Sequence, residues 1–305
     1  MTPWLSIIMP TYNGAAFLRG ALESIAAQHD DEVEVIAVDD GSTDATLDIL
    51  RHFAQRMPIT ILQRPHSGNW VESTNIGMQT ARAAHLSFLH QDDAWCAARL
   101  KRIRALLGRW PDAVVFLHPC WYMDASGRRI GYWHCPLPRR GRPLSAAEVL
   151  ERLLIQCFIA APAPVFRTDA ASSVGWLDSQ LWYSADWDFW LKLARLGATV
   201  YHPVALASFR LHAASQTLKL AGRGGELRRQ QAVVLGRHLG AWESLRPRDR
   251  EVARVAHFSA DVNAALADWA GGARPCRTQL IGRFVRLGPH AWRRYLRDSG
   301  IAERC

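Results

Sequence analysis

The chain has 305 residues, of which 49% are hydrophobic and 21% are charged, which excludes a disordered or fibrous protein and allows a well-buried core. The formal net charge is +9, yet residues 1–220 carry 21 basic and 20 acidic side chains, while residues 221–305 carry 16 and 8. The positive charge of the last 85 residues therefore predicts either a surface for an anionic partner or a solvated, arginine-rich helical face.

Targeting and redox features of the sequence predict a cytoplasmic protein. The longest apolar run, residues 157–166, contains two prolines and is shorter than a membrane-spanning helix, which needs roughly 20 residues. The N-terminus has neither the basic region nor the small-residue cleavage site of a signal peptide. The six cysteines include no CxxC pair and no metal-binding spacing, a pattern typical of reduced thiols.

The first part of the chain alternates short apolar runs with segments of helical periodicity. The predicted strands are residues 5–9, 33–38, 59–62 and 86–89, and helices are predicted at 15–27, at 47–53 and within 69–84. Such alternation implies a parallel sheet flanked by helices, in which ligands bind beyond the carboxyl ends of the strands. A polar segment follows each of the four strands: TYN, DDGSTD, HSGN and HQDD. We therefore expect a binding site at that edge of the sheet.

The rest of the chain is predicted to contain mixed elements and then helices alone. Between residues 96 and 220 we expect helices at 100–107, 148–154 and 186–196, strands at 114–118, 121–123, 164–166 and 204–211, and a proline-rich loop at 136–143. From residue 221 the periodicity predicts two or three arginine-rich helices, around 225–240, 249–270 and 276–297, with Gly271–Gly272 between the last two.

Acidic pairs and one histidine are candidates for chemistry. Asp39–Asp40 and Asp92–Asp93 each close a predicted strand, where carboxylates either cap a turn or hold a base, a ribose or a hard cation. Asp186 and Asp188 open a predicted helix, either as capping groups or, where a carboxylate faces the crevice, as a general base. His212 is a candidate metal ligand, phosphate contact or surface histidine. The sequence has no GxxxxGK[ST], GxGxxG or GxSxG motif.

Five segments, taken in order, resemble the family 2 glycosyltransferases. They are residues 7–13 (IIMPTYN), 38–44 (VDDGSTD), 88–95 (FLHQDDAW), 185–190 (ADWDFW) and 210–212 (RLH). The resemblance covers roughly residues 4–217 and implies a GT-A fold, a mostly parallel, Rossmann-like α/β sheet flanked by helices. It also implies a catalytic domain of residues 1–220, with a nucleotide-binding half at about 1–95 and an acceptor-side half at 96–220, and a C-terminal helical extension of residues 221–305.

The resemblance implies roles for individual residues. Asp186 matches the catalytic base, and Asp92 with His212 match the ligands of Mg²⁺ or Mn²⁺. Asp40 matches the acid that accepts the N3–H of the nucleotide base, which favours uracil or thymine. The residues implied in donor binding are Pro10, Thr11, Tyr12, Asn13, Asp39, Asp40, Ser42, Gly68, Asn75, His90, Gln91, Asp93 and Arg210.

Three positions depart from the family pattern. His90 stands at the first acid of the Asp-x-Asp motif, Ala185 replaces a glutamate, and Thr74 replaces an arginine that often contacts the nucleotide. The candidates to supply that cationic contact are Arg64, Arg99 and Arg210. These departures keep a second hypothesis open, a catalytically inactive subunit that binds nucleotide sugars or acts as a scaffold.

The implied function is inverting transfer of a sugar from a UDP- or dTDP-linked donor to a hydroxyl of a saccharide or lipid-linked acceptor, in cell-surface polysaccharide synthesis. No nucleic-acid-binding module is recognisable, so nucleic acid is not an expected partner. The extension mixes apolar and basic residues, which fits either a helix packed on the catalytic domain or peripheral contact with an anionic membrane at the inner face of the plasma membrane. We predict one of two roles for four tryptophans, either a flat face for a sugar ring or packing in the core. They are Trp176, Trp182, Trp187 and Trp190.

Overall fold

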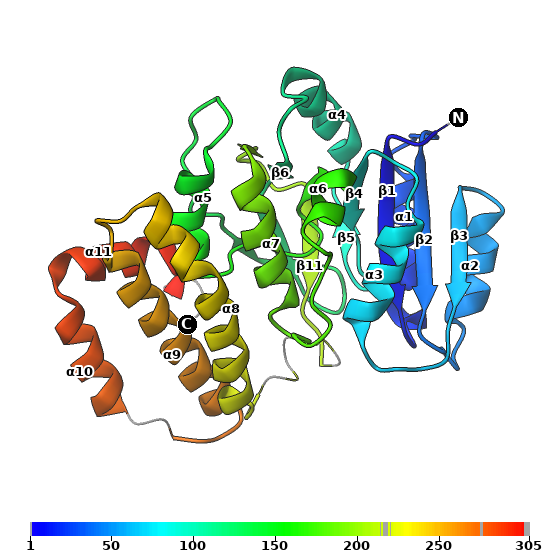
Figure 1. Ribbon diagram of the computed structural model, residues 1–305. Helices are drawn as coiled ribbons and strands as arrows, with labels where there is room; N and C mark the ends of the chain where they lie inside the picture. Colours follow the sequence, from blue (N-terminus) through cyan, green and yellow to red (C-terminus); the bar gives the residue numbers. More distant parts are fainter. Residues whose placement is uncertain (1, 214, 216–218, 220, 275–276, 302–305) are drawn as a thin grey trace.

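A seven-stranded sheet forms the centre of the computed structural model, which describes residues 2–213, 215, 219, 221–274 and 277–301 (Figure 1). The strand order is β10-β6-β9-β4-β1-β2-β3. Strands β4, β1, β2 and β3 run parallel, as predicted, and β9 is antiparallel to both of its neighbours. The strands are β1 (Leu5–Thr11), β2 (Val33–Asp39), β3 (Ile59–Gln63), β4 (His85–Phe88), β6 (Val115–Leu117), β9 (Val165–Arg167) and β10 (Thr199–Tyr201).

Helices connect the strands and bury the sheet. Every residue of β1 and β2 is buried, so both faces of the sheet are covered, as is usual for parallel strands. In α1 the residues Leu18, Leu22 and Ile25 form a buried stripe at helical spacing. The helices are α1 (Ala15–Ala26), α2 (Thr46–Ala54), α3 (Trp70–Thr80), α4 (Arg99–Arg109), α5 (Ala146–Leu153), α6 (Thr168–Ser173) and α7 (Ala185–Leu196).

A second, smaller sheet has the order β5-β11-β7-β8. Its strands are β5 (Ala94–Trp95), β7 (Cys120–Met123), β8 (Arg129–Trp133) and β11 (Ala207–Arg210). Because β11 pairs antiparallel with β5, the segment that follows β4 lies beside the end of β11. The sequence analysis did not predict β5, β8, β10 or α6, which have two, five, three and six residues.

The described residues from 221 onward form the helices α8 (Gly224–Leu245), α9 (Glu251–Ala270), α10 (Arg277–Leu287) and α11 (Pro289–Asp298). The prediction of one helix over 276–297 is wrong, because Gly288 has a φ of 84° and Pro289 starts a new helix. Figure 1 shows α8 alongside α7, and Val234 and Leu235 of α8 are buried in the same apolar core as the sheet. The domain boundary expected at residue 220 lies outside the described residues.

No helix in the described part of the chain is both long and apolar enough to cross a lipid bilayer.

Packing resolves the role of two tryptophans. Trp187 and Trp190 are 4% and 2% exposed, so they belong to the core and the alternative in which they face a sugar is wrong. Trp176 and Trp182 are half-buried.

The cysteines in the described part of the chain are unpaired thiols, namely Cys96, Cys120, Cys135 and Cys157. Two further cysteines, Cys276 and Cys305, lie outside the described residues.

Candidate active site

The loops after β1 and β2 are joined by hydrogen bonds centred on Asp39, which is 1% exposed. Its carboxylate accepts hydrogen bonds from Thr11 Oγ1 at 3.1 Å and from the backbone N–H and the hydroxyl of Ser42. Ser42 Oγ in turn accepts from the N–H of Asn13 at 2.9 Å. The two loops therefore hold each other in place, and Tyr12 between them is left 42% exposed.

Asp40 is bound by the HSGN segment that follows β3. Its carboxylate accepts from the N–H of Ser67 at 3.0 Å and from the N–H of Gly68 at 2.8 Å. Arg64 Nε and His66 Nδ1 lie 3.4 and 2.9 Å from its oxygens. Burial alone would raise the pKa of Asp40, but these hydrogen bonds and the Arg64 charge outweigh burial and lower the pKa. Asp40 is therefore an ionised carboxylate, only 5% exposed.

His66 is a site residue that the sequence analysis did not single out. Its ring stacks on Tyr12 with centroids 4.1 Å apart and an interplanar angle of 15°. Its Nδ1 also lies 2.9 Å from the backbone oxygen of Asp40. The only signal for His66 was its place in a polar segment at the carboxyl end of a predicted strand.

Gln91 attaches the segment after β4 to the loop after β1. Its Oε1 accepts from the N–H of Tyr12 at 2.9 Å, and its Nε2 donates to the carbonyl oxygen of Tyr12 at 3.0 Å. A Cβ atom at Gly14 would lie 2.2 Å from Gln91 Oε1, so a larger residue there would displace the Gln91 side chain from this position. The loops after β1, β2, β3 and β4 thus meet at one edge of the sheet.

His90, Asp92 and Asp93 offer ligand atoms that all lie within 4.8 Å of one another. Asp93 is 1% exposed, and its Oδ1 accepts from the N–H of Arg210 at 2.9 Å. Among the described residues, Asp93 Oδ2 and His90 Nε2 are buried without a hydrogen-bond partner. Burial, and then the charge of Asp92, raise the pKa of Asp93 well above its usual range, while burial lowers the pKa of His90. A divalent cation would satisfy these unpaired atoms.

The segment after β11 completes this cluster. His212 Nε2 lies 2.9 Å from Asp92 Oδ2, and its ring centroid is 4.6 Å from that of Phe17 in α1. The Arg210 guanidinium lies over the same Phe17 ring and donates to the carbonyl oxygen of Asp92 and to two carbonyls of the turn after β7. Phe17 was not predicted as a site residue, because its apolar side chain fits a core stripe equally well.

The three arginines considered as nucleotide contacts are engaged in other interactions. Arg99 is 0% exposed and donates to Ser87 Oγ at 3.0 Å, so it belongs to the core. Arg64 pairs with Glu72 at 2.8 Å in addition to Asp40. Arg210 holds the backbone carbonyls of neighbouring loops. Burial excludes Arg99 as a surface contact for a nucleotide.

Asp186 lies in the first turn of α7 and is partly exposed. Its Oδ1 accepts from the N–H of Trp187 at 2.7 Å. Burial among neighbouring groups raises the pKa of Asp186 to about 7, although that hydrogen bond acts in the opposite direction. A carboxyl group with a pKa near neutrality is well suited to accept a proton from a hydroxyl group.

The segment before α7 is attached to α3 next to the acidic cluster. Trp70 Nε1 donates to the carbonyl oxygen of Trp182 at 2.6 Å, and the Trp70 ring centroid is 5.5 Å from that of His90. Asn75 donates to and accepts from the backbone of Leu177, at 2.9 and 3.1 Å. Asn75 therefore supports the segment that leads to Asp186.

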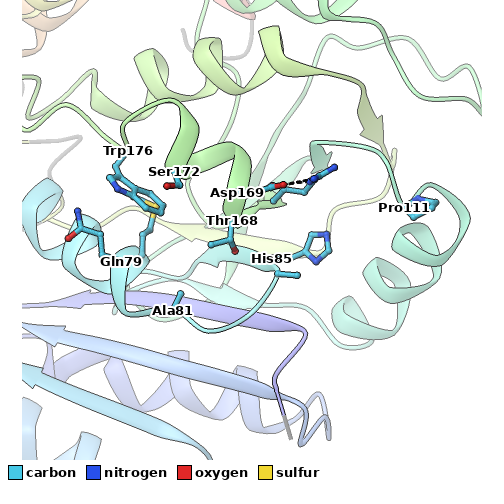
Figure 2. A pocket seen from close by; sticks show the side chains of 11 residues that line it. Gln79, Ala81, His85, Pro111, Thr168, Asp169, Ser172 and Trp176 are labelled. Atoms are coloured by element: carbon cyan, nitrogen blue, oxygen red, sulfur yellow. Dashed lines mark hydrogen bonds and ion pairs between the residues drawn. The ribbon is translucent and has the colours of Figure 1, made fainter.

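A surface hollow of about 700 Å³ lies at the end of the sheet where strand β4 begins, away from the carboxyl-end loops (Figure 2). It is lined by His85 at the start of β4, by Thr168 and Asp169 of α6, and by Trp176. Trp176, one of the tryptophans considered as a face for a sugar ring, lies here, whereas the residues predicted for catalysis, donor binding and metal binding do not line the hollow. Since the acidic cluster follows the other end of β4, the hollow is separated from it by the length of that strand.

The mostly parallel α/β sheet, covered by helices and with an acidic cluster at its carboxyl-end loops, agrees with the GT-A fold of the solved structures that it matches. TarS of Staphylococcus aureus, solved in complex with UDP-GlcNAc, matches with a TM-score of 0.63 and 17% identity, over 96% of this chain and 88% of TarS residues 1–349. A mannosyltransferase of Pyrobaculum calidifontis, in complex with GDP-Man and Mn²⁺, matches with a TM-score of 0.57 and 18% identity, over 98% and 84% of the two chains. These likenesses concern the fold alone.

Sequence comparison identifies the family. The profile of glycosyl transferase family 2 matches residues 6–171. A PGL/p-HBAD biosynthesis glycosyltransferase of Mycobacterium bovis is 32% identical over 213 residues, 68% of this chain and 77% of that protein. An uncharacterized glycosyltransferase of Rickettsia prowazekii is 27% identical over 221 residues, 71% of this chain and 66% of that protein. The chain belongs to glycosyl transferase family 2, which confirms the family and the GT-A fold expected from the five motifs.

Proposed function

We propose that the protein is an inverting, metal-dependent hexosyltransferase that moves a sugar from a UDP- or dTDP-linked donor to a hydroxyl of a saccharide or lipid-linked acceptor. The observation that carries the proposal is the meeting of four carboxyl-end loops with the cluster of His90, Asp92 and Asp93. The ligands named for the two similar solved structures, UDP-GlcNAc and GDP-Man with Mn²⁺, support a nucleotide-sugar donor. A place in cell-surface polysaccharide synthesis is proposed from the family resemblance.

The proposed donor site uses the loops after β1, β2 and β3. In the proposal the exposed ring of Tyr12, which stacks on His66, packs against the nucleoside, and Asp40 accepts the N3–H of the base. Gln91 holds the backbone of Tyr12 in place. The residues that shape or line these loops in the proposal are Pro10, Thr11, Asn13, Asp39, Ser42 and Gly68.

The cluster of His90, Asp92 and Asp93 fits a divalent cation, because buried oxygen and nitrogen atoms converge there without hydrogen-bond partners in the described chain. His212, which lies beside Asp92, is a further candidate ligand. The donor set includes nitrogen, so we propose Mn²⁺ ahead of Mg²⁺, which prefers oxygen ligands. When bound, the cation neutralises charge on the departing diphosphate.

Asp186 is the proposed general base. The acceptor hydroxyl gives its proton to the Asp186 carboxylate as its oxygen forms a bond with the anomeric carbon of the donor sugar. The bond between that carbon and the diphosphate oxygen breaks, and its electron pair leaves with the nucleoside diphosphate. A single displacement inverts the anomeric configuration and needs no enzyme nucleophile.

We expect UDP-linked sugars to raise the melting temperature in the presence of Mn²⁺ and to have a smaller effect without it. A ligand at 100 times its Kd adds about 2.7 kcal/mol to the free energy of unfolding, which corresponds to a shift of about 4 °C for a chain of 305 residues. Asp92→Asn should remove the part of the shift that depends on Mn²⁺, whereas Asp169→Asn, in the hollow of Figure 2, should not. A protein whose melting temperature responds to no nucleotide sugar would contradict the proposal.

We also propose that α10 contacts an anionic membrane. Ile281 and Val285, one helical turn apart, are 62% and 59% exposed, and Arg286 next to them is exposed as well. Apolar side chains beside basic ones on an exposed helix are typical of interfacial helices that bind anionic lipids. The net charge of +8 carried by residues 221–305, 16 basic against 8 acidic, is of the sign that such a surface attracts.

Sedimentation with vesicles tests this contact. We expect binding to vesicles rich in anionic phospholipid at low salt, and release at high salt, because salt screens the attraction. The double variant Ile281→Ser with Val285→Ser should bind less. Ile130→Ser serves as the matched control, since Ile130 is 50% exposed on β8, outside the extension. Equal sedimentation of all variants, or no sedimentation of the wild type, would exclude α10 as a membrane contact.

A further inference from the structure

Helix α8 contacts the chain on both sides of Asp186. Gln230 is 0% exposed, and its Oε1 lies 3.1 Å from the backbone N–H of Tyr183 and 3.1 Å from that of Ser184. Two turns further along α8, His238 Nε2 lies 2.9 Å from Asp188 Oδ1. Figure 1 shows α8 running beside α7 over this region.

The start of α7 is supported by this contact, because the side chain at its N-cap position does not serve as a cap and the Asp186 carboxylate accepts from the N–H of Trp187. Ser184 occupies the N-cap position, but its side chain makes no capping hydrogen bond. The first N–H groups of a helix have no acceptor within the helix, and buried N–H groups need one. Gln230 supplies the acceptor from 46 residues further along the chain.

The orientation of the Gln230 amide is set from within α8. Its Nε2 donates to Glu226 Oε1 at 2.6 Å, and Glu226 is itself paired with Arg229 at 2.7 Å. Since a carboxylate only accepts hydrogen bonds, the NH₂ group of Gln230 points to Glu226 and the oxygen points to the start of α7.

We propose that Gln230 is a positioning residue for sugar transfer: it holds the backbone of residues 183 and 184, and thereby the direction of the Asp186 carboxylate. The inference rests on the role proposed above for Asp186. Gln230 needs no contact with Asp186, which lies two residues beyond Ser184 in the same helical turn. The arginine-rich extension thereby has a part in the reaction, apart from the membrane contact of α10.

Gln230→Leu removes the acceptor and keeps the size of the side chain. We expect faster hydrogen exchange at the N–H groups of Tyr183 and Ser184. We also expect kcat for release of UDP from UDP-linked sugars, with Mn²⁺ and water as acceptor, to fall about tenfold or more, because small displacements of a catalytic group are costly. The KM for the donor should change less than about twofold, since the hydrogen bonds that Gln230 makes within the described residues go to Tyr183, Ser184 and Glu226, outside the donor loops.

Gln231→Leu is the matched control. Gln231 is the next residue of α8, is 6% exposed, and its Oε1 has no hydrogen-bond partner in the described part of the chain. This variant loses a buried amide from the same helix without touching the start of α7. Its kcat and its exchange at Tyr183 and Ser184 should equal those of the wild type.

A swapped pair provides a rescue. Gln230→Glu alone keeps oxygen acceptors but places a second carboxylate against Glu226, where the two charges repel. When Glu226→Gln is added, the amide at position 226 donates to the carboxylate at position 230. That carboxylate in turn accepts from the backbone N–H groups of Tyr183 and Ser184. The double variant should recover both kcat and exchange protection relative to Gln230→Leu.

Hydrogen exchange reports the contact between Gln230 and the start of α7, and kcat reports its effect on the reaction. Unchanged exchange at Tyr183 and Ser184 in Gln230→Leu would overturn the capping role. Faster exchange with an unchanged kcat would overturn the positioning role and leave the proposed function intact. A wild type that protects these amides but releases no nucleotide from UDP-glucose, UDP-galactose, UDP-GlcNAc or dTDP-linked sugars would overturn the proposed function and, with it, the positioning role.

Discussion

Asp186→Asn should lower the rate of UDP release by about 10²–10⁴-fold, the usual contribution of a general base. The amide has nearly the shape of the carboxylate but cannot accept a proton from a hydroxyl. The donor loops lie on other elements, so the melting-temperature shift produced by UDP-linked sugars with Mn²⁺ should stay the same. A variant that keeps most of the wild-type kcat would exclude Asp186 as the base.

The same variant should be more stable than the wild type above pH 7. Burial raises the pKa of Asp186 from its ordinary 3.8 to about 7 in the folded protein, so the fold favours the protonated form. The stability of the wild type therefore falls as the pH rises from about 4 to about 7, and the asparagine variant lacks this fall. Melting temperatures at pH 5 and pH 8 measure the difference, which should be larger at pH 8.

The pH profile of the wild-type reaction follows from the same group. Only the carboxylate form of Asp186 accepts a proton, so activity should rise with pH through about 7, where half of the groups are ionised, and level off above about pH 8. Cys157, whose own pKa is raised by burial and then by the charge of Asp186, stays protonated in this range. A rate that is flat between pH 5 and pH 8 would show that another group governs the reaction.

Asp188→Ala should destabilise the protein by about 3–5 kcal/mol, the usual cost of breaking a buried ion pair. Asp188 is 0% exposed, accepts from His238 at 2.9 Å and forms an ion pair with Lys192 at 2.7 Å. Removing the carboxylate leaves these groups without their partner between α7 and α8. Urea unfolding measures the loss of stability.

The exposed acid Asp48 provides the comparison for Asp188. Its side chain is 80% exposed and pairs with Arg51 at 3.1 Å, so Asp48→Ala should cost less than about 1 kcal/mol. Similar losses in the two variants would contradict the structural importance assigned to Asp188.

Asp188 and Asp186 make stability depend on pH in opposite directions: Asp188 loses its contribution as the pH falls, whereas Asp186 lowers the stability as the pH rises. Burial alone would raise the pKa of Asp188, but its bonds with His238 and Lys192 outweigh burial and lower the pKa to about 2. Its contribution to stability is therefore complete above about pH 4 and is lost as the pH falls toward 2. The wild type should lose more stability over this range than Asp188→Asn does.

Local patterns in the sequence were sufficient to predict the first half of the main sheet. The apolar runs that became β1 and β2 are fully buried, β4 is largely buried, and β3 at the edge of the sheet is only partly buried. The helices between them carry a period that depends only on near neighbours. The polar segments after these strands could be placed at one edge, because parallel strands end on the same side. The class of fold and most residues of the candidate site follow from that.

The sequence determined by itself which residues are available for chemistry: Tyr12, Asp40, Asp92 and Asp186 all lie in motifs of short range. Only the tertiary structure decided what surrounds them, since each partner comes from a distant segment. His66 stacks on Tyr12, Phe17 packs on His212, and Gln230 caps the start of α7 from 46 residues away. Periodicity reports which face of an element is buried but not which element buries it, because that choice is made by packing of the whole chain.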